Sequence, residues 1–555
     1  MRDTVILRDF VYVGERPVHY RIAGEGPPVI LLHQSPRNSA ELVPLMRILA
    51  HHFLVIAPDT PGYGQSGPVA PSPSEPDIDV FADAVIALLD ALGLDRAALF
   101  GSHTGAIIAV RVASRYPDRI SALVANGILM TRAEERSDKA DRYLPPLVPQ
   151  WDGGHLAWLW SRLRDQLAYY PWYRHDPAFR IHWPQSLEEI DASAIDLIEA
   201  GDDYRGAYGA VLSYDIAEDL TSLERPTLLV VARTDALSRF VASYPPVPGC
   251  VEVSLVADFP QVPEATLAFL LRQCLAPAAL RRSVDGPRPG LRSSFMGIGA
   301  GQLHLRRSAP VAGRPVLFLH DLGSSASALD PVLRGIAGRR PLLAPDLPGH
   351  AESDDFGATT PDELGAVMAA LLDALDVQEF DVVAVGASAA IATAMRRALR
   401  DRVCGQIAID PLLRPQGNLR EFSRALTPDL AADSAGSHLL RGWMYLRDRA
   451  LYFPWHDRSA AAQLAGGRPP RPVERQRALL DLLKSRGSLP AQLEAALAAT
   501  RDADLAAPAV RVLATPGAAI RLGGLPAGAL PDERFQWGAR VLRALEQGPV
   551  TPAGA

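Results

Sequence analysis

The feature of the chain that most suggests chemistry is a histidine framed by two glycines. Residues 101–105 read Gly-Ser-His-Thr-Gly, follow a short apolar run and precede a run with helical periodicity. A strand–turn–helix with this glycine spacing projects its central side chain from a strained turn. Acyl transfer would need Ser, Asp or Cys at the centre, where this chain has His103. An imidazole there can act as a general acid or base, because its pKa lies near neutrality.

An acidic partner for His103 follows a later strand-like run. Residues 228–231 are apolar, and Asp235 lies just beyond their end. An imidazole is longer than a serine side chain, so it can span directly toward this carboxylate. Such a partner would fix the ring's tautomer and raise its basicity. We therefore predict an acid–base pair of His103 and Asp235. The alternative is a degenerate turn in which the ring only fills space, at a cost in strain that has no evident purpose.

The 555 residues form a tandem repeat. His33 matches His320 at an offset of 320 − 33 = 287, and His103 aligns with Ser388 at an offset of 388 − 103 = 285. A repeat of this length is two whole domains, and 555 residues are too many for one hydrophobic core. We predict a first domain at 1–277 with a lid at about 130–222, a linker at 278–293, and a second domain at 294–547 with a lid at about 412–506.

Each half alternates short β-branched runs with runs of helical periodicity, which predicts an α/β fold with a mostly parallel, doubly wound sheet. The strands expected in the first half are residues 29–32, 54–57, 97–100, 123–125, 227–231 and 251–256. The long aromatic gap between the fourth and fifth of these exceeds a plain crossover and predicts a helical lid. With segments 33–36, 59–66 and 101–105, both halves resemble the α/β-hydrolase fold, with a lid after its sixth strand.

This resemblance implies a triad in the order nucleophile, acid after the seventh strand and histidine after the eighth. Asp235 fills the acid position of the first half, but its histidine position is empty, because no His occurs between Trp183 and Leu303. The second half keeps Ser388 and lacks both partners. A serine without an adjacent base attacks esters poorly, so we interpret Ser388 as a vestigial elbow and both triads as degenerate.

The resemblance also implies an oxyanion hole made of backbone N–H groups. It assigns these to Thr104 and to the region of Gln34 and Ser35, with His33 in the same pocket. A hole and an acid–base histidine without a nucleophile suit proton transfer beside a carbonyl. They equally suit hydrolysis by added water, elimination, isomerisation or C–C cleavage.

The two lids share a second repeated signature, since His155 pairs with His438 at an offset of 438 − 155 = 283. Its aromatic character favours a small organic substrate with an apolar part. The residues that we expect to contact this substrate are His155, Arg164, Trp172, Tyr204 and Tyr208.

Composition excludes several other classes of protein. A net charge of −7 gives no reason to expect nucleic acid, and no apolar run is long enough to cross a bilayer. We expect a cytoplasmic protein without metal or cofactor, whose two domains pair within the chain, with a homodimer possible. Three functions stay open: an enzyme using His103, a non-catalytic binder or scaffold, and a serine hydrolase in which a lid residue such as His438 reaches Ser388.

Overall fold

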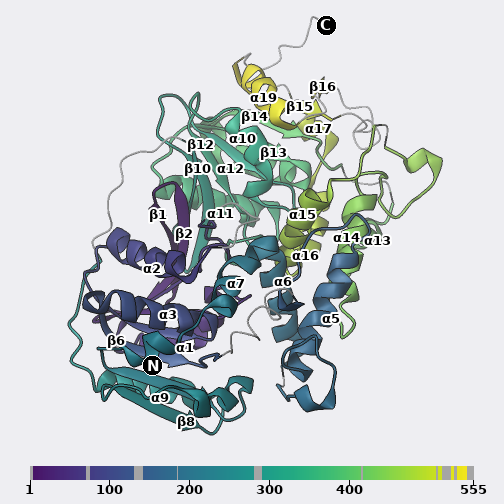
Figure 1. Cartoon of the computed structure of the whole chain (residues 1–555). Coiled ribbons are helices and arrows are strands. Elements are labelled where there is room, and N and C mark those ends of the chain that lie inside the picture. The colour runs from purple at the N-terminus through teal and green to yellow at the C-terminus, as the bar shows by residue number, and fades with distance from the viewer. Residues whose placement is uncertain are drawn as a thin grey trace, which may run out of the picture. The chain divides into compact units, whose positions relative to one another are not determined.

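The computed structural model of the chain describes residues 4–69, 76–130, 142–183, 185–280, 290–413, 417–464, 466–507, 510–515, 527–530 and 534–546. The chain divides into two compact units, Met1–Gln150 with Gly154–Val284, and Asp285–Ala555 with Trp151–Gly153. Each unit contains an eight-stranded, mostly parallel sheet (Figure 1). The predicted fold class, two tandem α/β-hydrolase folds, is therefore confirmed. Most of the predicted linker, residues 281–289, lies outside the described residues.

The first sheet has the strand order β1-β2-β4-β3-β5-β6-β7-β8. Strand β2 runs antiparallel to both of its neighbours, and the others run parallel. The strands are β1 Leu7–Val13, β2 Arg16–Ala23, β3 Pro28–Leu32, β4 Leu54–Pro58, β5 Ala97–Ser102, β6 Ile120–Asn126, β7 Thr227–Ala232 and β8 Val251–Val256. Every residue of β3, β4 and β7 is buried, as expected of parallel strands covered on both faces.

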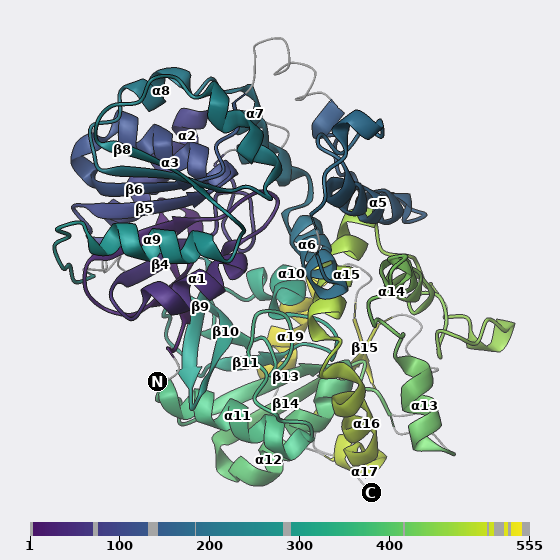
Figure 2. The same ribbon diagram turned by 90° about the horizontal axis from the view of Figure 1, so that it is seen from below.

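Helices cover both faces of this sheet. Figure 2 shows α2 (Ile78–Leu92) and α3 (Thr104–Arg115) on one face and α1 (Val43–Leu49) and α9 (Gln261–Leu271) on the other. Helix α2 begins where the Asp77 side chain accepts a hydrogen bond from the Val80 N–H. Nine residues of α3 are buried, because this helix packs directly behind β5 and β6. The core on the other side lies between the strands and α1 with α9.

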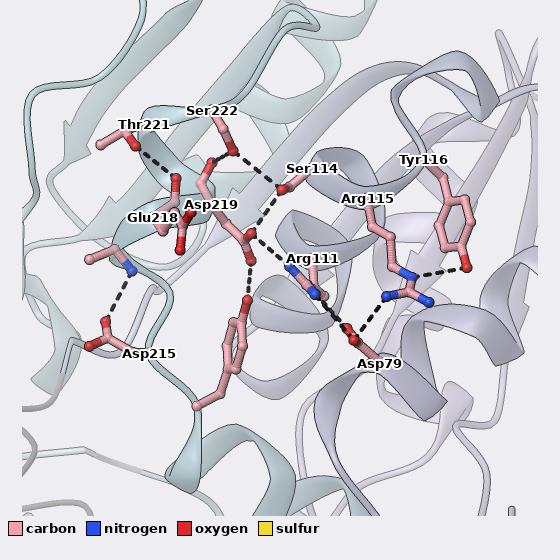
Figure 3. Close-up of polar contacts among 12 residues, drawn as sticks. Asp79, Arg111, Ser114, Arg115, Tyr116, Asp215, Glu218, Asp219, Thr221 and Ser222 are labelled. Atoms are coloured by element: carbon pink, nitrogen blue, oxygen red, sulfur yellow. Dashed lines mark hydrogen bonds and ion pairs between the residues drawn. The ribbon is translucent and has the colours of Figure 1, made fainter.

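The first lid lies between β6 and β7, and its described helices are α5 (Gly154–Ala168), α6 (Leu187–Ala200), α7 (Arg205–Ser213) and α8 (Ala217–Thr221). Its last helix is fixed to the body of the domain by a polar network, which Figure 3 shows. Asp219 of α8 accepts hydrogen bonds from Arg111 at 3.0 Å and from Ser114 at 2.8 Å, both on α3. Arg111 also donates to Asp79 of α2 at 2.5 Å. These charge-assisted contacts fix the end of the lid to α2 and α3.

The second unit repeats this design with the strand order β16-β15-β14-β13-β11-β12-β10-β9. Its strands are β9 Leu291–Ile298, β10 Gly301–Ser308, β11 Val316–Leu319, β12 Leu342–Pro345, β13 Phe380–Val385, β14 Val403–Ile409, β15 Val510–Ala514 and β16 Gly528–Ala529. The helices beside the sheet are α10 Asp330–Arg334, α11 Pro361–Ala374, α12 Ala389–Leu399 and α19 Trp537–Glu546. The lid helices are α13 Leu419–Leu426, α14 Ser437–Asp448, α15 Pro472–Ser485, α16 Leu489–Ala499 and α17 Asp502–Leu505. None of the described helices of either unit is long and apolar enough to cross a membrane.

Candidate active site

His103 stands at a strained turn between β5 and α3. Its backbone has φ 48° and ψ −104°, a conformation that non-glycine residues rarely adopt. The turn is held by a hydrogen bond of 2.8 Å from the His103 N–H to the carbonyl of Asn126. The helix that follows packs so closely on β3 that a Cβ at Gly105 would lie 2.3 Å from the carbonyl oxygen of Leu32. The glycine of the motif is therefore required, and the turn projects its histidine from the sheet.

The imidazole of His103 contacts the carboxylate of Asp235. Nε2 of the ring lies 2.8 Å from Oδ2 of Asp235, whose other oxygen accepts the Leu237 N–H at 2.8 Å. Asp235 is only 2% exposed. Behind the pair lies Gly127, where a Cβ would come 2.4 Å from Cδ2 of the ring. The predicted contact between His103 and Asp235 is present in the structure. Their role in catalysis stays a prediction.

The electrostatics of the pair favour a charged, hydrogen-bonded state. Burial acts to lower the pKa of His103, but the charge and hydrogen bond of Asp235 outweigh it, so this pKa is raised above its ordinary value. Burial acts to raise the pKa of Asp235, but the interaction with His103 holds it below its usual range. Because Nε2 is bound to Asp235, Nδ1 is the nitrogen left for a substrate, and it has no hydrogen-bond partner among the described residues.

A cavity of about 60 Å³ opens beside His103. On the same scale one enclosed water needs roughly 10–15 Å³, so the cavity has room for a small organic molecule. Its polar and aromatic lining residues are Gln34, Ser35, His103, Thr104, Tyr143, Gln166, Tyr170, Trp183, Tyr208 and Asp235. Its aliphatic walls include Ile107, Leu129, Ile181, Val211 and Leu212. The combination of apolar walls and a few convergent polar groups is typical of a small-molecule site.

The predicted oxyanion donors are partly engaged. The backbone N–H of Gln34 donates to Glu41 at 2.7 Å, so it does not serve as an oxyanion donor here. The N–H of Ser35 makes a long contact of 3.3 Å with the hydroxyl oxygen of Thr104. Because that oxygen accepts from Ser35, the hydroxyl proton of Thr104 remains for a ligand in the cavity.

His33 does not line the cavity, contrary to the prediction. The ring is 1% exposed and uses both nitrogens to fix the backbone. Nδ1 donates to the Gln34 carbonyl at 2.9 Å, and Nε2 accepts the Thr60 N–H at 2.8 Å. His320 makes the corresponding pair of contacts in the second domain. His33 therefore supports the loop and has no nitrogen left for a substrate.

Of the five lid residues predicted to contact substrate, only Tyr208 lines the cavity. His155 is buried and accepts the Gln150 N–H on Nδ1. The ring N–H of Trp172 donates to the carbonyl oxygen of Tyr143 at 3.2 Å. The hydroxyl group of Tyr204 donates to the carbonyl oxygen of Pro145 at 2.5 Å. Arg164 of α5 is exposed. The helical spacing of the lid residues correctly predicted helix α5. It did not predict which face of α5 lies toward the cavity.

Trp183, a lid residue beside His103, was not predicted from the sequence. Its ring meets the His103 ring edge-on, with centroids 5.8 Å apart, and stacks on Phe259 at 5.4 Å. Phe259 belongs to the segment after β8 in which the resemblance expects the triad histidine. An aromatic pair therefore lies near the position of the missing histidine. In the sequence, the absence of His from the segment after β8 was the feature that could have indicated a different side chain at this position.

The structure corrects the alignment of Ser388 with His103. Leu32 pairs with Gly101 in the first sheet, and Leu319 pairs with Ala384 in the second. Two residues beyond Gly101 and Ala384 stand His103 and Gly386, with φ of 48° and 62°. Gly386 is thus the elbow residue of the second domain, at an offset of 386 − 103 = 283.

Ser388 corresponds instead to Gly105. It is fully buried with an ordinary φ of −68°, and its hydroxyl oxygen lies 3.1 Å from the carbonyl oxygen of Leu319 and 2.9 Å from that of Val385. A hydroxyl held against the backbone in this way does not reach a substrate.

The elbow region of the second domain is filled by its own charged side chains. Asp321 accepts the N–H of Ala387 at 3.0 Å, the amide that follows the elbow as Thr104 follows His103. Arg449 of the lid pairs with the other oxygen of Asp321 at 3.0 Å. A Cβ at Gly386 would lie 2.2 Å from Asp321, so this arrangement and a side chain at the elbow exclude one another.

Comparison with known proteins agrees with this architecture. A model described as the alpha/beta hydrolase fold matches residues 27–244, and an alpha/beta hydrolase family model matches residues 316–528. The chain belongs to the α/β-hydrolase fold family. It is 34% identical to an uncharacterized hydrolase of Saccharomyces cerevisiae over 137 residues, which are 24% of this chain and 45% of the yeast protein. The chain thus spans less than half the length of that relative.

Two further likenesses cover 41% and 49% of this α/β-hydrolase chain. A putative carbamate hydrolase, RutD, of Agrobacterium fabrum is 24% identical over 226 residues, 41% of this chain and 82% of that protein. The crystal structure of epoxide hydrolase A from Mycobacterium thermoresistibile is 20% identical with a TM-score of 0.39 and covers 49% of this chain and 100% of its own.

Proposed function

We propose that the N-terminal domain is an enzyme that acts on a small, partly apolar carbonyl compound through the acid–base chemistry of His103, without an acyl-enzyme. The observation that carries this proposal is the 2.8 Å contact between Nε2 of His103 and Asp235 at the wall of the cavity. A dyad of this kind orients the ring and stabilises the imidazolium that forms when Nδ1 takes a proton. The chemistry is hydrolysis, elimination, isomerisation or C–C cleavage.

In this proposal the substrate carbonyl lies near Thr104, whose hydroxyl donates a hydrogen bond to the carbonyl oxygen. Nδ1 of His103 removes a proton from water or from the carbon beside the carbonyl, and the imidazolium later returns it to the product. The negative charge that develops on the oxygen is stabilised by the donor, as in other oxyanion sites. Asp235 keeps its charge throughout and compensates that of the ring.

A covalent serine or threonine mechanism lacks an activated hydroxyl at this cavity. The hydroxyl groups of Ser35 and Tyr63 are hydrogen-bonded to each other at 2.8 Å. The hydroxyl oxygen of Thr104 accepts a hydrogen bond from the Ser35 N–H. In the described part of the chain, neither hydroxyl group is hydrogen-bonded to His103, which is the base that would have to activate it. The elbow position itself carries the imidazole, so water or the substrate must be the proton donor.

For the C-terminal domain we propose a non-catalytic role. Gly386 supplies no side chain at the elbow, and Asp321 occupies the amide that an oxyanion would use. If the N-terminal domain proves inactive as well, the whole chain is a small-molecule binder built on a hydrolase fold.

A substrate panel in D₂O tests the proposal. The full chain is incubated with short esters, lactones, ketones and 1,3-diketones, and proton NMR records both products and deuterium beside the carbonyl. We expect turnover of at least one class by the native protein and its loss in His103→Ala. Turnover that survives in His103→Ala would exclude the mechanism. Binding of panel members without any turnover would favour the binding protein.

A further inference from the structure

Arg162 of α5 is a buried cation without a counter-ion in the described part of the chain. It is 1% exposed, and its guanidinium lies over the rings of Trp172 at 5.6 Å and Tyr143 at 6.0 Å. Nη1 makes one long contact of 3.4 Å with Oε1 of Gln166. Nε and Nη2 have no hydrogen-bond partner, and no carboxylate of the described residues pairs with the group.

Such an arrangement is costly unless something compensates the charge. A guanidinium stays charged at all physiological pH values, and a buried charge is normally paired and fully hydrogen-bonded. Aromatic faces compensate only part of the lost solvation. Buried polar groups that lack partners call for an explanation, and a ligand with negative charge is one.

The neighbours of Arg162 connect it to the cavity. Gln166 and Tyr143 both line the cavity beside His103, and both also contact Arg162. Because Gln166 directs its carbonyl oxygen to Arg162, its amide N–H₂ remains as a donor. The hydroxyl group of Tyr208 donates to the hydroxyl oxygen of Tyr143 at 3.3 Å, which leaves the hydroxyl proton of Tyr143 for a further acceptor. The cavity thus has a second set of hydrogen-bond donors, the Gln166 amide and the Tyr143 hydroxyl, and the Arg162 cation lies behind them.

In the second domain, a carboxylate pairs with the residue that corresponds to Gln166. Arg449 stands where the first lid has Gln166, at the lid offset of 449 − 166 = 283, and Asp321 stands where the first domain has Gln34, since 321 − 34 = 287. These two side chains form the 3.0 Å ion pair described above, and Asp321 also binds the amide after the elbow. In the duplicate domain, a carboxylate of the chain itself therefore lies between a lid cation and the elbow.

We propose that the N-terminal site takes a substrate with a carboxylate as well as a carbonyl, and that Gln166 and Tyr143 bind this carboxylate with Arg162 behind them. In the C-terminal domain the side chain of Asp321 fills the equivalent position permanently. The inference rests on the proposed function for its choice of site, and it specifies the substrate as a small oxo acid rather than a neutral carbonyl compound.

A matched pair of ligands tests the proposal without turnover. 4-Oxopentanoate and 4-oxopentanamide have the same size and carry the same ketone, and they differ in charge. Their affinities are measured by calorimetry on the full chain with His103→Ala, in which the chemistry is removed. We expect the carboxylate to bind at least about tenfold more tightly than the amide. Equal affinities, or no binding of either at millimolar concentration, would overturn the proposal.

Three variants locate the charge preference. Arg162→Met should abolish it, and Gln166→Glu should abolish or reverse it, because a second carboxylate in the cavity repels the ligand. Arg164→Met is the control, since this arginine lies on the same helix but is exposed. If Arg162→Met does not fold, Gln166→Glu decides alone, and a preference that survives in it refutes the proposal. A charge preference without turnover in the native protein would overturn the proposed catalysis and leave this inference intact.

Discussion

Gly127→Ala should inactivate the dyad without removing either of its members. A Cβ at this position would lie 2.4 Å from Cδ2 and 2.8 Å from Nε2 of His103, and 3.4 Å from Oδ2 of Asp235. Carbon atoms in contact stay roughly 3.5–4.0 Å apart, so the ring must move by about 1 Å. The present contact of 2.8 Å then stretches beyond hydrogen-bond distance. The substitution therefore separates His103 from Asp235.

The expected loss of rate is large and the expected loss of stability moderate. General acid–base catalysis typically contributes about 10²- to 10⁴-fold, so kcat should fall by at least about 10²-fold. Gly127 has φ +74°, and a side chain in the left-handed region costs roughly 1–2 kcal/mol. A domain with a stability of about 5–15 kcal/mol still folds after that loss.

The assay is kcat on the best panel substrate, with thermal unfolding measured in parallel. Gly14→Ala is the matched control, because Gly14 has φ +62° and a Cβ there would meet nothing within 4 Å. It should show a similar strain and an unchanged rate. A folded Gly127→Ala protein with native kcat would refute the argument that the His103–Asp235 contact is needed.

Three further predictions concern the titration of His103, the reactivity of Ser388 and the contribution of Asp219 to stability. If His103 acts as a base, kcat/KM should rise with pH through a pKa above 6.5, because Asp235 raises the pKa of His103. Asp235→Asn should shift this rise to lower pH. It should also reduce the rate less than His103→Ala does. A fluorophosphonate should leave the native protein unlabelled, as seen by intact mass, and stoichiometric labelling of Ser388 would show that its buried hydroxyl is reactive after all. Asp219→Asn should lower the free energy of unfolding, measured by chemical denaturation, by roughly 1–3 kcal/mol, because hydrogen bonds to a buried carboxylate are weakened. The control is Asp83→Asn, which should change this free energy little because Asp83 is exposed.

The sequence was sufficient for the fold and for the centre of the candidate site. Two whole-domain repeats, the alternation of strands and helices, and the strand–turn–helix around His103 are local patterns, and each constrains the structure directly. Asp235 could be assigned because it follows a strand of a parallel sheet, and the carboxyl ends of such strands meet at one edge.

The lining of the cavity could not be predicted in the same way. Which of the lid side chains face His103 depends on how α5 and α7 pack, and Tyr143 and Gln166 carry no motif of their own. Ser388 was misaligned because the offset between the halves falls from 287 to 283 before the elbow, so that Gly-Ala-Ser-Ala-Ala imitates the motif two residues late. The pairing of β11 with β13 establishes Gly386 as the elbow residue.

The titration of the His103 ring is the most direct test of whether His103 and Asp235 form a coupled acid–base pair. Two-dimensional NMR of protein labelled at histidine, with the signal assigned by its absence in His103→Ala, gives this pKa without any substrate. We expect a pKa above the ordinary value of about 6.5 in the native protein and a clear decrease of this pKa in Asp235→Asn. A His103 ring that titrates at or below 6.5 and does not respond to Asp235→Asn would contradict this expectation.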